Sequence, residues 1–182
     1  MNTPLFALAA LAASWMPGWA PSWFGGPHRP SAEIWHGTHV GMSPRLVLRM
    51  FPAARPTVAG ASLGGDVEGA SMLTRVADHD TVAHFFFGKR GLSTVVLDIA
   101  DIETGRTAAN LVEAHEFGDL IARKYGPAEA CASPQPQALA QSYRCRWTTG
   151  PLHIELEYRE AAPPPALTVT YRVNGDAGGS GL

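Results

Sequence analysis

The sequence predicts an α+β domain in which two helix-then-antiparallel-strand units build an antiparallel sheet with helices packed on one face. Two segments with helical periodicity, 44–51 and 107–125, are each followed by segments in which apolar and polar residues alternate. The two helical segments also end alike, in Met-Phe-Pro-Ala and in Lys-Tyr-Gly-Pro-Ala, which indicates a weak duplication with a period of roughly 75 residues. A parallel α/β sheet would need strands that alternate singly with helices, and this pattern is absent.

The first unit spans residues 34–100 of a single domain at 34–173. A short strand at 34–36 and a turn at 37–41 precede the first helix, for which Ser43 is a favourable N-cap. Pro44 suits the first helical position and Pro52 ends the helix. Strands are then expected at 72–76, 82–87 and 92–99, the last two joined as a hairpin through Gly88-Lys89-Arg90-Gly91.

The second unit spans residues 107–173. Its helix places an apolar stripe on one face, formed by Leu111, Ala114, Phe117, Ile121 and Tyr125. Gly126-Pro127 ends the helix, and strands are expected at 143–147, 152–158 and 167–173. In the middle strand the apolar residues alternate with His153, Glu155, Glu157 and Arg159, which predicts one buried and one charged, solvated face.

The amino-acid composition limits the classes of function that the protein can have. An apolar fraction of 46% is enough for a core, and 182 residues fit one domain of ordinary size. The 14 Lys and Arg residues against 16 Asp and Glu give a net charge of −2, whereas a nucleic-acid-binding protein normally has a basic excess. We therefore expect no nucleic-acid partner.

The N-terminal residues predict export. The apolar run at 5–16 is shorter than the roughly 20 residues of a membrane-spanning helix but has the length of a signal-peptide hydrophobic region. We assign residues 1–20 to a signal peptide, 21–33 to a Pro-, Gly- and Trp-rich linker and 174–182 to a flexible tail. The protein is then periplasmic or secreted, without a transmembrane segment. The first four residues carry no Lys or Arg, so an apolar arm packed on the domain is the alternative.

The two cysteines, Cys131 and Cys145, flank a segment rich in Pro, Gln and Ala. Two cysteines do not complete a structural zinc site, which needs four ligands. In an oxidising compartment their disulfide would close a loop of about 15 residues and stabilise the fold by roughly 3 kcal/mol. We predict this disulfide, and the even number of cysteines favours export.

Several stretches together resemble a known class of proteins: HGTHVGMSPRLVLRMFP, the hairpin HFFFGKRGLSTVVLDI, the helix end RKYGPAEA, and the strands CRWTTGPLHIELEYRE and LTVTYRV. They resemble small exported bacterial proteins of unassigned function. The layout over residues 34–173 is also similar to the β-lactamase-inhibitor-like fold of outer-membrane-assembly lipoproteins, although the lipoprotein cysteine is missing here. The resemblance implies an accessory role in the envelope and brings no catalytic residue with it.

A Gly-x-Ser-x-Gly motif raises a second possibility, a serine hydrolase. In the sequence GASLGG, Ser62 would be the nucleophile, as in the sharp strand-to-helix turn of α/β-hydrolases. A triad would need an aspartate such as Asp98 or Asp101 and a histidine such as His115 or His153. The residues around the motif predict neither the preceding strand nor the following helix, so a small-residue loop is the simpler interpretation.

The histidines suggest a third possibility, a metal-binding module. His36 and His39 are three residues apart, and His79 and His84 lie on either side of the start of a strand. Neutral imidazoles could bind a transition metal together with Asp78 or Asp80. Solvated or locally hydrogen-bonded histidines explain the same pattern with fewer assumptions.

The favoured function is an exported, non-enzymatic binding or accessory module of the bacterial envelope that uses no cofactor. Its partner, a protein or a small molecule, is unknown, and its contact surface would be a face of the sheet or an exposed strand edge. The paired carboxylates Glu155 and Glu157 are expected to be surface charges. Phe85, Phe86 and Phe87 put aromatic rings on both faces of one strand, so one ring must pack on a helix, the N-terminal arm or a partner.

Overall fold

The structure is a computed structural model that describes residues 32–132, 140–162 and 164–173. The assigned signal peptide, nearly all of the linker and the C-terminal tail lie outside these residues. The elements follow in the order β1 (Glu33–Trp35), β2 (Thr38–His39), α1 (Pro44–Met50), β3 (Arg55–Pro56), β4 (Ser62–Leu63), β5 (Asp66–Val76), β6 (His79–Gly88), β7 (Gly91–Ile99), α2 (Thr107–Tyr125), β8 (Ala130–Ala132), β9 (Ser142–Thr149), β10 (Leu152–Arg159) and β11 (Ala166–Val173).

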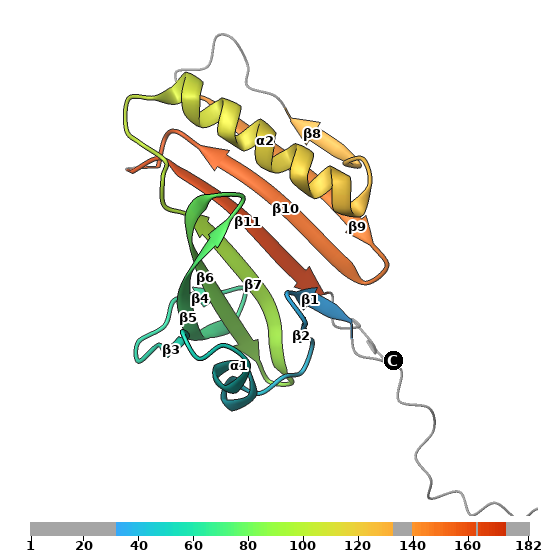
Figure 1. The fold of residues 1–182 in the computed structure, drawn as a ribbon. Helices are drawn as coiled ribbons and strands as arrows, with labels where there is room; N and C mark the ends of the chain where they lie inside the picture. Colours follow the sequence, from blue (N-terminus) through green and yellow to red (C-terminus); the bar gives the residue numbers. More distant parts are fainter. Residues whose placement is uncertain (1–31, 133–139, 163, 174–182) are drawn as a thin grey trace, which may run out of the picture.

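Nine of these strands form one antiparallel sheet (Figure 1). Its order is β3-β5-β6-β7-β11-β10-β9-β8, and β4 pairs with β5 beside this path. β11 thus lies in the middle of the sheet and joins the strands before α2 to those after it. β1 and β2 form a small separate sheet, which contacts the ends of β7 and β11.

The predicted fold class is wrong. The described chain is mostly strand, and it contains two unequal helices rather than two equivalent helix-strand units. α1 has 7 residues and buries Val47 alone, whereas α2 has 19 residues and buries five. Five strands follow α1 and four follow α2. The difference arises because β3, β4 and β8 are two- or three-residue strands that exist through pairing with longer neighbours and leave no alternation in the sequence.

α2 runs along β9 and β10 and covers one face of this half of the sheet (Figure 1). Gly118 faces the sheet, and a Cβ at this position would make ordinary van der Waals contacts with the Tyr143 hydroxyl at 3.4 Å and with Leu156 at 3.6 Å. The helix ends at Gly126, which has a φ of 90° and donates its N–H to the carbonyl of Ala122 at 2.9 Å. Within the described residues, neither helix is long and apolar enough to cross a membrane.

The core lies between the sheet and the helices. On β10 and β11, the buried positions are Leu152, Ile154, Leu156, Tyr158, Leu167, Val169, Tyr171 and Val173. Phe85 of β6 belongs to the same core, and Phe86, which points to the other face of its strand, is also buried. Strand alternation therefore sends the polar residues of β10 and β11 to the face opposite α2.

Candidate functional site

The face of the sheet opposite α2 carries polar side chains from three neighbouring strands. We call it the open face and define it by Arg144, Arg146, Thr148, His153, Glu155, Glu157, Thr168, Thr170 and Arg172. All of these residues line a cavity of about 640 Å³, which Leu63 of β4 and Glu129 also border. The sequence predicted the solvated face of β10, but the neighbours on β9 and β11 follow from strand pairings that the sequence does not reveal.

The strand register decides which charges of the open face meet. Arg144 bridges two acids of β10: its Nε lies 3.0 Å from Glu155 Oε1, and its Nη2 donates a hydrogen bond to Glu157. That hydrogen bond, together with the negative charge of Glu157, raises the pKa of the Arg144 guanidinium. Arg159 adds a second cation 3.5 Å from Glu157. The expectation that Glu155 and Glu157 are surface charges agrees with these contacts, in which both carboxylates are neutralised.

Two arginines of the open face, unlike Arg144, lie outside its ion pairs. Arg146 lies opposite Glu155, and Arg172 lies opposite His153, in adjacent rows of the sheet. Neither arginine forms an ion pair with any residue in the part of the chain that the structure describes. The open face therefore presents two guanidinium groups whose charge is available to a ligand, beside acids whose charge is already balanced.

A second polar cluster joins β5 to β6. Glu68, which is 8% exposed, places Oε1 2.8 Å from Nδ1 of His84. The same carboxylate accepts hydrogen bonds from the Thr57 hydroxyl and from the Ala61 amide. Nearby, partial burial raises the pKa of Asp98, and His84 opposes this shift. Sequence reasoning missed Glu68. This residue pairs with Phe86, which lies two residues from His84 on the same face of β6, and the irregular register between Glu68 and Ala70 cannot be recognised from the sequence.

The Gly-x-Ser-x-Gly motif forms a hairpin rather than a nucleophile turn. Ser62 is exposed on the two-residue β4, opposite Val67, and the long strand β5 follows it where a hydrolase would need a helix. The turn is made by Gly64 and Gly65, both with positive φ. At Gly60 a Cβ would clash with the carbonyl group of Glu68, so this glycine lets the segment lie close against β5.

The structure does not assemble the triad that the hydrolase hypothesis needs. His115 lies on α2, with its ring 4.1 Å from the ring of Tyr143, so it is on the helix side of the sheet. Asp101 lies 3.6 Å from His79. Asp98 is on β7, and His153 is on β10, where its Nδ1 lies 3.3 Å from the Thr148 hydroxyl.

The four histidines of the metal hypothesis do not converge. His36 lies in the β1–β2 turn against Trp35, and His39 is on β2. His79 and His84 are five residues apart on β6 and therefore point to opposite faces. In residues 32–132, 140–162 and 164–173 no group of three His, Cys, Asp or Glu side chains is placed to hold a metal ion.

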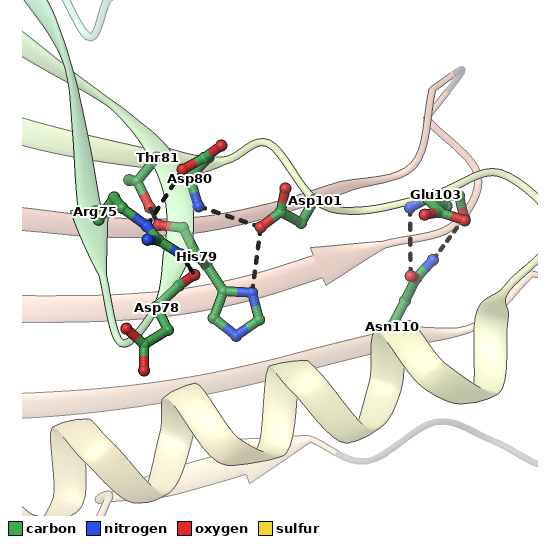
Figure 2. Close-up of polar contacts among 8 residues, drawn as sticks. All are labelled: Arg75, Asp78, His79, Asp80, Thr81, Asp101, Glu103 and Asn110. Carbon is green, nitrogen blue, oxygen red and sulfur yellow. Dashed lines mark hydrogen bonds and ion pairs between the residues drawn. The ribbon is translucent and has the colours of Figure 1, made fainter.

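His79 instead belongs to a structural cluster that ties the β5–β6 hairpin to the loop before α2 (Figure 2). Its Nδ1 faces Asp101, whose Oδ2 also accepts the Asp80 amide at 3.1 Å, and its ring packs against Phe117 of α2. Arg75 completes the turn with an ion pair to Asp80. These contacts account for His79 without a ligand.

The predicted disulfide is confirmed. Cys131 of β8 and Cys145 of β9 are directly opposite each other and are bonded. The Tyr143 hydroxyl lies 3.0 Å from the Cys145 sulfur, and burial raises the pKa of this tyrosine, helped by the negative charge of Asp119. The bond fixes β8, the outermost strand on this side of the sheet, to the rest of the fold.

Comparison with known proteins adds a distant likeness. No protein-family model and no curated protein matches the chain. The fold is similar to the crystal structure of a DUF4309 family protein (YjgB) from Bacillus subtilis, with 13% sequence identity, 70% of this chain and 75% of that chain covered, and a TM-score of 0.35. A likeness at this level supports no inference about function, and the similarity to the β-lactamase-inhibitor-like fold stays a prediction.

Proposed function

We propose that the protein is an exported, non-enzymatic binding module of the bacterial envelope, and that its open face binds an acidic segment of a protein partner. The observation that carries this proposal is the pair of guanidinium groups of Arg146 and Arg172, which have no ion pair in the described residues, on the wall of a 640 Å³ cavity. Arginine binds carboxylates with two parallel hydrogen bonds, which gives orientation as well as affinity.

The remaining groups of the open face suit the same partner. Arg144 and Arg159 balance Glu155 and Glu157, so these acids would repel an incoming carboxylate less than free acids would. Thr168 and Thr170 add hydroxyls on β11 that can donate to or accept from a peptide backbone. The affinity should fall as the salt concentration rises, because exposed charges are screened.

A labelled peptide of alternating Glu and Ser residues tests the binding surface by fluorescence anisotropy with the full chain. Arg146→Gln and Arg172→Gln should each weaken binding about tenfold, as expected for a hydrogen bond between charged groups. The control is Arg123→Gln, which removes the same charge from α2 on the opposite side of the sheet. Equal weakening by the control would mean unspecific charge attraction, and no binding at all would refute the proposal.

The export part of the proposal has a separate test. It is supported by the disulfide, because such bonds persist in oxidising compartments. The intact mass of the protein from fractionated cells, with thiols alkylated before and after reduction, should show a chain shortened by about 12–30 residues in the periplasm or medium. Its thiols should react only after reduction. A full-length cytosolic chain with two free thiols would overturn this part.

A further inference from the structure

A second cavity, of about 370 Å³, lies where the tips of two hairpins meet the end of β11. We call it the hairpin cavity and define it by Gly64, Asp66, Lys89, Arg90, Thr94 and Arg172. The tip of the β4–β5 hairpin reaches the last strand here, since a Cβ on Gly64 would lie 3.6 Å from Arg172 Nη2. Arg172 therefore stands between this cavity and the cavity of the open face.

Glycine shapes the β6–β7 side of the hairpin cavity. Gly91 has a φ of 100°, and a Cβ there would lie 2.5 Å from the carbonyl oxygen of Gly41. A Cβ on Gly88 would lie 2.5 Å from Asp66 Oδ1. These close approaches hold the turn that carries Lys89 and Arg90 against the neighbouring loop and the start of β5.

The charges around the hairpin cavity are mostly positive. Lys89, Arg90 and Arg172 make no ion pair within the described ranges of the chain. Asp66 is the single acid that lines the cavity, and its carboxylate accepts a hydrogen bond from the Ser93 hydroxyl. This hydrogen bond partly stabilises the negative charge of Asp66. Three cations against one engaged carboxylate favour an anionic ligand.

Thr94 provides an independent indication of a ligand. Its side chain is 1% exposed, and its Oγ1 has no hydrogen-bond partner among the described residues. Thr94 lies opposite Phe86 on one side and opposite Arg172 on the other, so its hydroxyl is buried beside a guanidinium. Buried hydroxyls are normally paired, and one that lines a cavity can donate to an acceptor that enters it.

We propose that the hairpin cavity binds an oxyanion, either a phosphate group or a carboxylate. The Arg172 guanidinium donates hydrogen bonds to two oxygens of the anion, and the Thr94 hydroxyl donates a further one. Lys89 and Arg90 neutralise the remaining negative charge of the anion. Arg172 also belongs to the open face, so an anion in this cavity and an acidic partner on the open face share its guanidinium, whereas Thr94, Lys89 and Arg90 border the hairpin cavity and not the open-face cavity. The ligand can be a free anion or the charged end of a larger molecule, because the recognising chemistry is the same.

Titration of the isotope-labelled full chain with inorganic phosphate, followed by NMR, tests the site. Binding should shift the amide signals of Gly64, Gly91 and Thr94, at constant ionic strength set with sodium chloride. A parallel titration with acetate distinguishes a phosphate site from a carboxylate site by which anion binds more tightly. Shifts that chloride reproduces, or shifts spread evenly over the surface, would overturn the proposal.

Thr94→Val is the decisive variant because it keeps the shape of the side chain and removes the hydroxyl. Phosphate affinity should fall about tenfold. The thermal midpoint without phosphate should stay the same or rise, because an unpaired buried hydroxyl is lost. Thr94→Ser, which keeps the hydroxyl, should retain most of the affinity. Arg123→Gln, which removes a positive charge from α2 on the other side of the sheet, should leave the phosphate affinity unchanged. Wild-type phosphate affinity in Thr94→Val would refute the site.

Discussion

Breaking the bond between Cys131 and Cys145 should lower the free energy of unfolding by about 3 kcal/mol. The two cysteines are 14 residues apart, and chain entropy predicts this loss for a loop of about that length. Other contacts of β8 add little to the stability of the folded state, because all three of its residues are exposed and, among the described residues, the strand pairs with β9 alone. The urea midpoint should fall by about 1–3 M, given typical denaturant slopes.

The assay is urea unfolding followed by tryptophan fluorescence, to which the buried Trp35 and Trp147 contribute, with and without reductant. Cys131→Ala is the matched variant, because Cys131 is exposed and Cys145 keeps its buried sulfur. This variant should be as unstable as the reduced wild type and should not respond to reductant. A loss below about 1 kcal/mol, or a response of the variant to reductant, would refute the loop-entropy reasoning.

Three further substitutions test other parts of the fold. Tyr158→Phe removes a fully buried hydroxyl that has no hydrogen-bond partner in the described residues. It should raise the free energy of unfolding by about 1 kcal/mol, and a lower free energy in urea unfolding would indicate that the hydroxyl has a partner. Burial raises the pKa of Asp98 above its ordinary 3.8, so folded-state stability falls as the pH rises through the window above that value. Asp98→Asn should therefore have a higher thermal midpoint than the wild type at neutral pH and the same midpoint in acid. A higher midpoint of the variant at low pH would contradict the raised pKa of Asp98. Gly60→Ala should lower the free energy of unfolding by about 1–3 kcal/mol, because the added Cβ would clash with Glu68. An unchanged urea midpoint would show that the segment around Gly60 shifts without loss of stability.

Local signals in the sequence located the long elements well. α2 spans the predicted residues 107–125, and α1 begins at Pro44 after the predicted N-cap Ser43, whose side chain accepts the Leu46 amide. The alternation on β10 and β11 gave their buried faces correctly. These predictions are correct because helix caps and hydrophobic periodicity depend on residues that are close together in the sequence. The fold class failed because the size of a sheet depends on pairings between distant segments, such as β7 with β11.

The candidate site was predictable only in part, for the same reason. The charged side of β10 can be recognised from Glu155 and Glu157, yet nothing near them in the sequence indicates that Arg172 becomes a neighbour of His153. The glycines around Ser62 suggested a catalytic turn, whereas their spacing serves a hairpin that reaches across the sheet. A cavity formed by two hairpins and a distant strand leaves no contiguous pattern in the sequence.

The position of β11 has a consequence for the order of folding. β7 ends at residue 99 and β10 at residue 159, and both need residues 166–173 to complete their hydrogen bonding on the inner side. A growing chain that has not yet supplied these residues keeps two unpaired strand edges, which are sites of aggregation. Joining β7 to β11 also closes a long loop, which slows folding. We therefore expect the whole sheet to close only after residues 166–173 are available, late in the folding of the chain.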